Sequence, residues 1–340
     1  MAIKLLYLGN RLNQKGKTPT SIETLGFFLQ YEGFEVFKYS SVKNQILRLL
    51  DMHFGVLKHR KEVDFVLIDT YSTLGFWYAY LSGILARKLN IKYIPILHGG
   101  DLPKRLKTHP QACQQLFSNA HINIAPSAYL LHHFQEAGYT NLRYIPNTIE
   151  LQHYTYRERS HIAPKLLWVR SFAQIYNPIL ALKVLQQLLA YYPNAQLSMV
   201  GPFKDDSIEA CKAYAAKHNL PVTFTGGMPK ADWLKYAQDF DIFINTTNVD
   251  NTPVSVIEAM ALGLPVVTTN VGGIPYLLED QKEALLVPLD NVHAMAQAIT
   301  SLLENPVQAK SLSETGRQKV EAFDWEVVKE KWSGILNSEF

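Results

Sequence analysis

The stretch NVDNTPVSVIEAMALGLPVVTTNVGGIP, Asn248–Pro275, contains a series of signals for local structure. Thr252 is a preferred N-cap residue, and Pro253 suits the first position of a helix. Gly263 is placed to end this helix, and the apolar residues 264–269 predict a buried strand that leads into a Gly-Gly turn. A short helix that runs directly into a buried strand is typical of a parallel α/β sheet.

The first turn of this helix has backbone N–H groups, at Val254, Ser255 and Val256, that are free to meet an anion. Glu258 lies one helical turn beyond Ser255 on the same face, and Asp250 lies on the loop before the helix. A carboxylate that accepts hydrogen bonds from two adjacent hydroxyl groups suits a ribose or a hexose. The spacing alone also fits an ordinary pair of surface acids.

Short apolar runs alternate with longer amphipathic stretches along the rest of the chain, which predicts doubly wound parallel sheets. Predicted strands are Lys4–Leu8, Glu35–Tyr39, Asp64–Ile68, Lys92–Leu97, Ile122–Ala125, Leu142–Ile145, Lys165–Val169, Gln196–Val200, Val222–Thr225, Asp241–Asn245, Pro265–Thr269 and Leu285–Val287. Predicted helices include Ser21–Tyr31, Thr73–Leu89, Pro178–Tyr191, Ser207–His218, Lys230–Gln238 and Val292–Leu303.

A polar stretch at residues 154–161 has no clear period and interrupts this alternation. We therefore expect two α/β domains, residues 1–160 and residues 161–322, with a last helical segment at 323–338 that packs back on the first domain. Two doubly wound domains bring the carboxyl ends of their strands to a shared cleft, which is where ligands of such folds bind.

Composition is that of a globular protein, with 340 residues, 47% hydrophobic and 19% charged. The two cysteines, Cys113 and Cys211, are far apart and favour a reducing compartment, with each acting as a small apolar residue. A signal-peptide pattern and a run long enough to span a membrane are both absent from the sequence, so we expect a cytoplasmic location. Residues 1–160 have 19 basic and 11 acidic side chains, which indicates either an anionic partner or solvated helix faces.

The segment GNRLNQKGKTPTS, Gly9–Ser21, resembles a P-loop because a glycine loop follows an apolar strand. A P-loop needs a second glycine four intervening residues before Gly16, and Arg11 occupies that position. Asp69, at the end of another apolar strand, resembles the magnesium-binding acid of such proteins, but strands of this kind are common in parallel sheets. A glycine loop whose backbone approaches a ligand is the better interpretation.

The stretch 248–275 resembles the signature of family 4 glycosyltransferases, which have the GT-B fold: two facing Rossmann-like doubly wound domains with a cleft between them. Asp250 and Glu258 have the seven intervening residues of the two signature acids, and Ala-Met-Ala, Gly-x-Pro-Val-Val and Gly-Gly follow. Further matching segments are LLWVRS at 166–171, LSMVGP at 197–202, VTFTG at 222–226, APS at 125–127, IPN at 145–147 and His98-Gly99.

The resemblance implies a role for each matching residue. Glu258 would hold the ribose hydroxyls, Asp250 a sugar hydroxyl, and Arg170 the diphosphate. His98 would lie near the reacting carbon; the alternative is a core or capping histidine. The remaining implied donor-binding residues are Ser255, Val254 and Val256 at the sugar phosphate, Gly201, Thr225 and Gly226 near the base, and Gly16 and Lys17 at the diphosphate or acceptor.

This sequence departs from the family pattern at three positions. The first signature acid is Asp250 rather than glutamate, and Asn177 stands where the family has a phosphate-binding lysine. Tyr276 stands where many members have a further glutamate. These departures affect the expected donor sugar and rate more than the expected fold.

The function that the resemblance implies is a retaining glycosyltransferase of cell-surface polysaccharide or glycolipid assembly. It would move a sugar from a UDP- or GDP-linked donor to a glycan or lipid-linked acceptor, without a metal, a separate cofactor or a nucleic acid. Asp239 and Asp241 resemble a metal-binding Asp-x-Asp, but they precede a buried strand, which favours a structural role. Alternatives are a catalytically silent nucleotide-sugar-binding partner, a nucleotide-sugar epimerase of the same fold and a P-loop NTPase or kinase.

A group of basic residues surrounds the apolar segment 46–50 in the first half of the chain. The group consists of Lys43, Arg48, Lys58, Arg60 and Lys61. It predicts either a patch that contacts the inner face of a membrane or a solvated helix.

Overall fold

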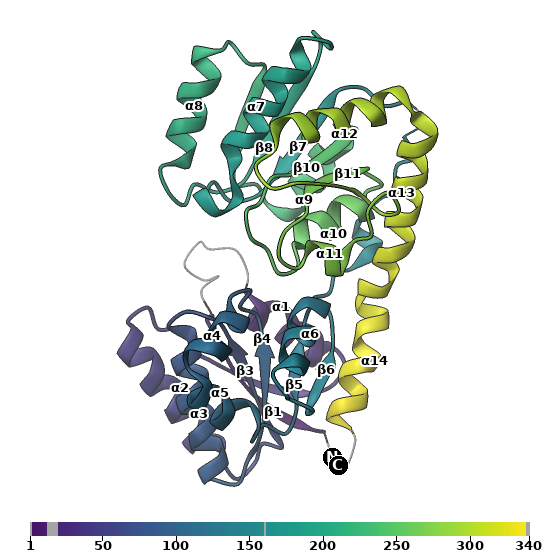
Figure 1. Cartoon of the computed structure of the whole chain (residues 1–340). Coiled ribbons are helices and arrows are strands. Elements are labelled where there is room, and N and C mark those ends of the chain that lie inside the picture. The colour runs from purple at the N-terminus through teal and green to yellow at the C-terminus, as the bar shows by residue number, and fades with distance from the viewer. Residues whose placement is uncertain (1, 12–19, 160, 338–340) are drawn as a thin grey trace. The chain divides into compact units, whose positions relative to one another are not determined.

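The computed structural model describes residues 2–11, 20–159 and 161–337, and it divides the chain into two compact α/β units (Figure 1). The first unit consists of Met1–Asn147 and the C-terminal segment from Trp325 onward, and the second unit is Thr148–Asp324. The segment that begins at Trp325 thus belongs to the first unit, in line with the predicted return of the last helix.

The boundary differs from the one predicted near residue 160. Ile149, Leu151 and Tyr154 are buried in the hydrophobic core of the second unit, and the backbone N–H of Ile149 donates to the carbonyl oxygen of Phe323 at 2.9 Å. Residues 148–159 therefore belong with the second unit, although their sequence has neither a helical nor a strand period.

The first unit is built on a six-stranded parallel sheet with the order β2-β1-β3-β4-β5-β6. Its strands are β1 (Lys4–Leu8), β2 (Glu35–Tyr39), β3 (Phe65–Thr70), β4 (Lys92–Leu97), β5 (Asn123–Ala125) and β6 (Leu142–Tyr144). Its helices are α1 (Ser21–Tyr31), α2 (Gln45–His59), α3 (Gly75–Lys88), α4 (Leu102–Thr108), α5 (Pro110–Phe117), α6 (Ala128–Glu136) and α14 (Trp325–Leu336).

Helix α14 packs against the first unit through its aromatic and apolar face. The ring of Trp325 stacks on Phe28 of α1, with the ring centroids 4.7 Å apart. Its indole N–H donates a hydrogen bond of 2.9 Å to a carboxylate oxygen of Glu32. Val328 and Trp332 are buried in the same core as the sheet residues of β1 and β3, so the last helix completes one side of this unit.

Helix α2 has a buried side and an unusually apolar exposed side. Met52 and Val56 are buried, whereas Ile46 and Phe54 are 73% and 57% exposed. Arg48 belonged to the predicted basic patch, but its guanidinium group donates to the side-chain oxygen of Asn10 at 2.9 Å and to the carbonyl of Val42 at 2.8 Å. Arg48 thus serves an internal role, because these acceptors occupy its donor groups.

The second unit is built on a six-stranded parallel sheet with the order β12-β11-β10-β7-β8-β9. Its strands are β7 (Lys165–Val169), β8 (Gln196–Val200), β9 (Val222–Gly226), β10 (Ile242–Asn245), β11 (Val266–Thr269) and β12 (Leu285–Val287). Its helices are α7 (Pro178–Leu189), α8 (Ser207–Lys217), α9 (Lys230–Tyr236), α10 (Val254–Ala261), α11 (Ile274–Leu277), α12 (Val292–Glu304) and α13 (Pro306–Val320).

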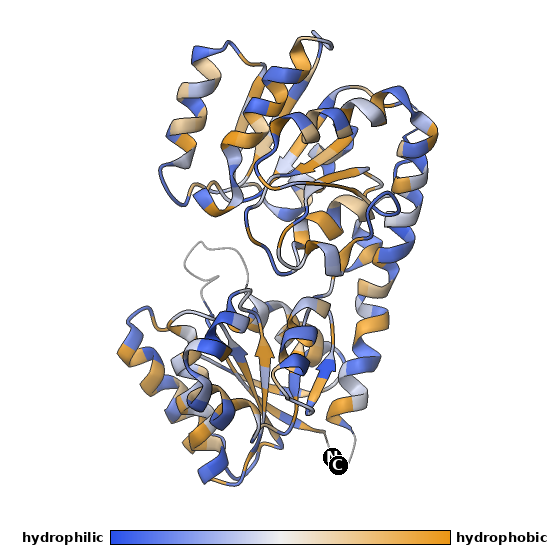
Figure 2. Cartoon of the chain, in the orientation of Figure 1, coloured by the Kyte–Doolittle hydropathy of each residue, from blue (hydrophilic) through white to orange (hydrophobic). Residues whose placement is uncertain are grey.

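The strands are apolar on both faces because helices cover each side of a parallel sheet. Strand β3 is buried along its whole length, and four of the five residues of β1 are buried. Figure 2 shows hydrophobic residues along the strands and both hydrophobic and hydrophilic residues on the surrounding helices. Cys113 and Cys211 are buried, and this burial raises the pKa of each thiol to about 12, which agrees with their predicted role as apolar residues. Across the described ranges, every helix is too short or too polar to cross a bilayer.

Candidate functional site

The strand order of the second unit creates a switch point between β7 and β10. The chain runs from β7 outward through β8 and β9, and then returns to the other side of β7 at β10. Ligands of open α/β sheets bind at the carboxyl ends of the strands at such a point. Arg170 follows β7 directly and Asp250 lies on the loop after β10, so these two predicted site residues lie at the switch point.

Arg170 and Asp250 form an ion pair in the structure. Both side chains are largely buried, with 14% and 12% of their surface exposed. The guanidinium group also lies over the ring of Tyr176, 4.8 Å from its centroid, while its Nε atom has no partner among the described residues. Burial lowers the pKa of Arg170 to about 10, so the group remains charged at neutral pH and has donor capacity left for an anion.

The Gly-Gly turn holds the loop that carries Asp250. The backbone N–H of Gly273 donates to the carbonyl oxygen of Asp250 at 2.8 Å. A Cβ atom at Gly272 would lie 2.3 Å from that oxygen, and one at Gly273 would lie 1.7 Å from the carbonyl oxygen of Asn251. Glycine is therefore required at both positions by the close approach of two backbone segments.

Helix α10 begins as a candidate anion site, with two corrections to the prediction. Pro253, rather than Thr252, is the residue before the helix, and it makes no side-chain cap. The N–H of Val256 donates to the carbonyl oxygen of Pro253 at 3.0 Å, so it is not free for an anion, because a helix that begins at Val254 uses it in the first turn. In the described part of the chain no bond is made by the backbone N–H groups of Val254 and Ser255.

The hydroxyl group of Ser255 adds to this donor set. The residue is 8% exposed, and its Oγ atom is buried without a partner among the described residues. A buried hydroxyl group that makes no hydrogen bond is costly. At the positive end of a helix, a ligand oxygen would satisfy both this hydroxyl and the free N–H groups.

Glu258 is buried one turn further along α10 and is held by two donors. Its Oε1 atom accepts a hydrogen bond of 2.9 Å from the hydroxyl group of Tyr154. The same atom forms an ion pair with Lys230 at the start of α9. The Lys230 side chain is about half exposed (53%), and desolvation still lowers its pKa to about 8 against the opposing charge of Glu150. Both contacts end on Oε1, which leaves Oε2 as an acceptor.

Lys230 and Tyr154 are contacts that the sequence did not reveal. Lys230 lies over the rings of Tyr154 and Trp233, 5.1 and 5.8 Å from their centroids. In the sequence Tyr154 lies 104 positions before Glu258, and Lys230 resembles any first-turn lysine of a surface helix. Tyr154 stands between His153 and Thr155 in a polar stretch, so its local sequence does not indicate that it is buried.

Gly201 and Gly226 lie at the ends of β8 and β9, close to Arg170. The N–H of Gly201 donates to the carbonyl oxygen of Gly226 at 2.8 Å. A Cβ atom at Gly201 would lie 1.7 Å from the carbonyl oxygen of Arg170, so this glycine allows the loop after β7 to approach β8. Thr225 donates its hydroxyl to Gly226 at 2.9 Å. These predicted residues therefore lie together at the carboxyl edge of the sheet.

Asn177 lies at the start of α7, and its amide nitrogen contacts Asn248 and Asp290 at 3.3 and 3.1 Å. It links two loops and provides no positive charge at the position where the resemblance led us to expect a lysine. Gly16 and Lys17, the predicted donor- or acceptor-contacting residues of the glycine loop, lie outside the described residues.

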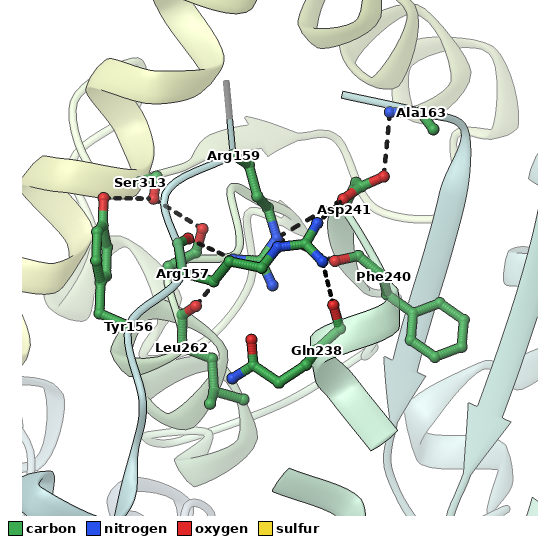
Figure 3. Close-up of polar contacts among 10 residues, drawn as sticks. Tyr156, Arg157, Arg159, Ala163, Gln238, Phe240, Asp241, Leu262 and Ser313 are labelled. Carbon is green, nitrogen blue, oxygen red and sulfur yellow. Dashed lines mark hydrogen bonds and ion pairs between the residues drawn. The ribbon is translucent and has the colours of Figure 1, made fainter. Parts of the chain in front are cut away.

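Asp241 has the structural role that its sequence context predicted. Figure 3 shows Arg157 and Arg159 directed toward its carboxylate. Arg157 pairs with Oδ1, and the Nε atom of Arg159 lies 3.9 Å from the same oxygen. The other oxygen accepts the N–H of Ala163 at 3.2 Å. These contacts fasten Arg157, Arg159 and Ala163 to the body of the second unit, and they occupy both oxygens of the carboxylate.

His98 lies in the first unit, directly after β4. Its Nε2 atom is 2.8 Å from Oδ1 of Asp69, and the side chains are 10% and 0% exposed. Oδ1 also accepts a hydrogen bond of 2.9 Å from the hydroxyl group of Tyr7. A carboxylate accepts only, so Nε2 of His98 carries a proton, and Nδ1 is the nitrogen left for other contacts. Asp69, which resembled a magnesium ligand in the sequence, thus orients the histidine.

Comparison with known proteins agrees with this arrangement. Residues 157–319 match the family model described as glycosyl transferases group 1. A GDP-mannose-dependent monoacylated alpha-(1-6)-phosphatidylinositol monomannoside mannosyltransferase of Corynebacterium glutamicum is 28% identical over 166 residues, which is 46% of this chain and 43% of that enzyme. An amylovoran biosynthesis glycosyltransferase of Erwinia amylovora is 24% identical over 271 residues, 71% of this chain and 63% of that enzyme.

The chain thus spans less than two thirds of these curated relatives. Among solved structures, Anabaena Alr3699/HepE in complex with UDP and glucose superimposes with a TM-score of 0.78 at 16% identity, over 99% of this chain and all of that one. This likeness shows a shared fold. The chain therefore has the two-unit GT-B fold, and its residues 157–319 are similar to the glycosyl transferases group 1 family.

Proposed function

We propose that this protein is a retaining, metal-independent glycosyltransferase that moves a sugar from a nucleoside-diphosphate sugar to a glycan or lipid-linked acceptor. The observation that carries the proposal is the set of groups at the β7/β10 switch point. The loop after β7 provides the largely buried guanidinium of Arg170, and α10 provides two free N–H groups, the Ser255 hydroxyl and the buried carboxylate of Glu258. Such donors suit a diphosphate, and such an acceptor suits a ribose.

In this function Arg170 and the start of α10 stabilise the negative charge that develops on the departing diphosphate. Asp250, once an anion takes its place beside Arg170, accepts hydrogen bonds from the sugar. Oε2 of Glu258 accepts from the ribose hydroxyls. The corynebacterial and Anabaena relatives are named with GDP-mannose and with UDP, so both bases are candidates for this chain.

A binding screen tests the donor. Thermal unfolding is measured with UDP, GDP and their glucose, galactose, mannose and N-acetylglucosamine conjugates, because a ligand of the folded state raises the unfolding midpoint. The proposal predicts stabilisation by one base series, followed by transfer to an acceptor mixture with EDTA present. Stabilisation without transfer or hydrolysis would identify a silent binding partner instead, and loss of activity in EDTA would contradict metal independence. NMR of the product anomeric carbon tests retention.

We propose further that α2 brings the first unit to an anionic membrane that carries the acceptor. Its exposed apolar surface consists of Ile46, Leu47, Leu50, Phe54 and Leu57, each between 43% and 73% exposed. Exposed basic residues, Lys43 and Lys58, lie beside it. Apolar side chains next to lysines favour the interface of a bilayer with anionic lipids.

Co-sedimentation with vesicles tests this surface. We expect binding to vesicles of phosphatidylglycerol and phosphatidylcholine, weaker binding to phosphatidylcholine alone, and loss of binding with rising salt. Phe54→Glu should weaken binding at least about tenfold, because it removes one large apolar group worth about 1.5–3 kcal/mol on burial. Val307→Glu is the matched control, since Val307 is 80% exposed on α13 of the second unit. Equal binding by both variants would refute the role of α2.

A further inference from the structure

The first unit also has a switch point, between β1 and β3. The two strands are paired as far as Leu8 and Ile68. Beyond that pair, the N–H of Gly9 turns to the carbonyl oxygen of Tyr39 at 2.7 Å, on the β2 side. On the other side, the N–H of His98 donates to the carbonyl oxygen of Thr70 at 2.9 Å. The strands therefore separate at their carboxyl ends, which is where sheets of this order bind ligands.

Asp69 lies at this opening with one oxygen atom unused. Oδ1 accepts from Tyr7 and His98, whereas Oδ2 is buried and has no hydrogen-bond partner among the described residues. The side chain has no exposed surface. Buried carboxylate oxygens are almost always paired, because an unpaired one loses the hydration that it had in water. Oδ2 therefore requires a donor from outside the described protein.

The space for that donor is built into the backbone. A Cβ atom at Gly9 would lie 2.4 Å from Oδ2, so any larger residue would fill the space beside this oxygen. Gly9 and Asp69 line one pocket together with Tyr71, Tyr78 and Met52. The space in this partly open pocket is about 10 Å³, which admits one group of the size of a water molecule or a hydroxyl.

We propose that Asp69 Oδ2 accepts a hydrogen bond from one hydroxyl group of a neutral sugar acceptor, in a subsite between β1 and β3 next to His98. The proposal rests on the proposed glycosyltransferase function and names an acceptor contact for it. A carboxylate accepts hydrogen bonds and repels anions, so phosphate and carboxylate ligands are excluded. Tyr71 and Tyr78 line the same pocket, so aromatic side chains border the position of this hydroxyl group.

The test uses the full chain with UDP or GDP present, whichever binds, and the methyl α-glycosides of glucose, galactose, mannose and N-acetylglucosamine as probes. Binding is measured by saturation-transfer NMR. Gly9→Ala fills the space at Oδ2, and Asp69→Asn keeps the shape but removes the charge that makes the oxygen a strong acceptor. Asp64→Asn is the matched control, because Asp64 is an exposed acid directly before the same strand.

We expect at least one glycoside to bind the parent and Asp64→Asn equally, Gly9→Ala to lose binding, and Asp69→Asn to bind at least about fivefold more weakly. Nucleotide affinity, which depends on the second unit, should be the same in all four proteins, and this separates the subsite from the proposed function. If Gly9→Ala unfolds, Asp69→Asn still decides. Equal glycoside binding by Asp69→Asn and the parent, or no glycoside binding by a parent that binds nucleotide, would overturn the subsite and leave the space to an ordinary water molecule.

Discussion

Replacing Glu258 by glutamine tests the nucleoside half of the proposed site, because it keeps the size of the side chain and removes its charge. In the structure both internal donors, Tyr154 and Lys230, bind Oε1. A ribose therefore has Oε2 available without displacing either donor. Hydrogen bonds to a charged group contribute about 1.5–3 kcal/mol, against about 0.5–1.5 for neutral pairs. The difference of about 1–2 kcal/mol predicts roughly 5- to 30-fold weaker nucleotide binding.

The assay is isothermal titration calorimetry with the nucleoside diphosphate selected by the screen and with its 2′,3′-dideoxy analogue. The two changes, in the protein and in the ligand, form a double-mutant cycle. If Glu258 holds the ribose, the analogue binds the parent more weakly than the natural ligand, and Glu258→Gln makes little distinction between them. Tyr154→Phe is the control, since it removes a donor to Oε1 and leaves Oε2 in place.

Two results would refute this reasoning. One is a nucleotide affinity of Glu258→Gln within twofold of the parent, because the expected loss of about 1–2 kcal/mol corresponds to at least roughly fivefold. The other is an equal loss of affinity for the dideoxy analogue in both proteins, which would place the ribose elsewhere. Unfolding must be measured beside binding, because the buried hydroxyl of Tyr154 also loses a charged acceptor in this variant.

Arg170→Ala should lower kcat by about 100-fold, as removal of one charge-stabilising donor does in other enzymes; steady-state kinetics with near-normal kcat would contradict its role. Asp241→Ala should destabilise the second unit by about 3 kcal/mol, because it leaves the buried Arg159 without its counter-charge; an unchanged urea midpoint would disprove this. Lys230 has a folded-state pKa of about 8, below its ordinary 10.5, so the unfolded state binds more protons between these values and stability should rise with pH there. Lys230→Met should lack that rise, and parallel pH–denaturation curves for both proteins would show the inference to be wrong.

The sequence predicted most strands of both sheets because parallel strands are buried on both faces and appear as short apolar runs between amphipathic stretches. The exact ends were less accurate: β3 extends to Thr70, two residues beyond its predicted end. The domain boundary was wrong for a physical reason. Residues 148–159 are anchored by single apolar side chains, Leu151 and Tyr154 among them, and by backbone contacts, and neither leaves a period in the sequence.

In the candidate site, residues within local motifs were predicted, whereas their partners from distant segments of the chain were not. Arg170, Asp250 and Glu258 were predicted from the resemblance of their motifs to family 4 glycosyltransferases, and the fold brings the first two into contact. Lys230 and Asp69 were not predicted as partners of site residues, because pairing across two strands or two helices depends on packing that one segment does not encode. The prediction of a free backbone N–H group at Val256 was wrong by one helical position. The sequence does not show at which residue the first hydrogen bond of a helix forms.

The pairing of buried charges in the second unit affects how strongly a nucleoside diphosphate that carries a sugar binds. In the second unit each buried site carboxylate has a cationic partner, Arg170 for Asp250 and Lys230 for Glu258. An anion that binds Arg170 competes with Asp250, and the released carboxylate then lacks a partner in a poorly hydrated place. A sugar hydroxyl on the same ligand restores that hydrogen bond. A nucleoside diphosphate that carries its sugar should therefore bind more favourably than its phosphate contacts alone would indicate, because one part of the ligand satisfies the group that the other part displaces.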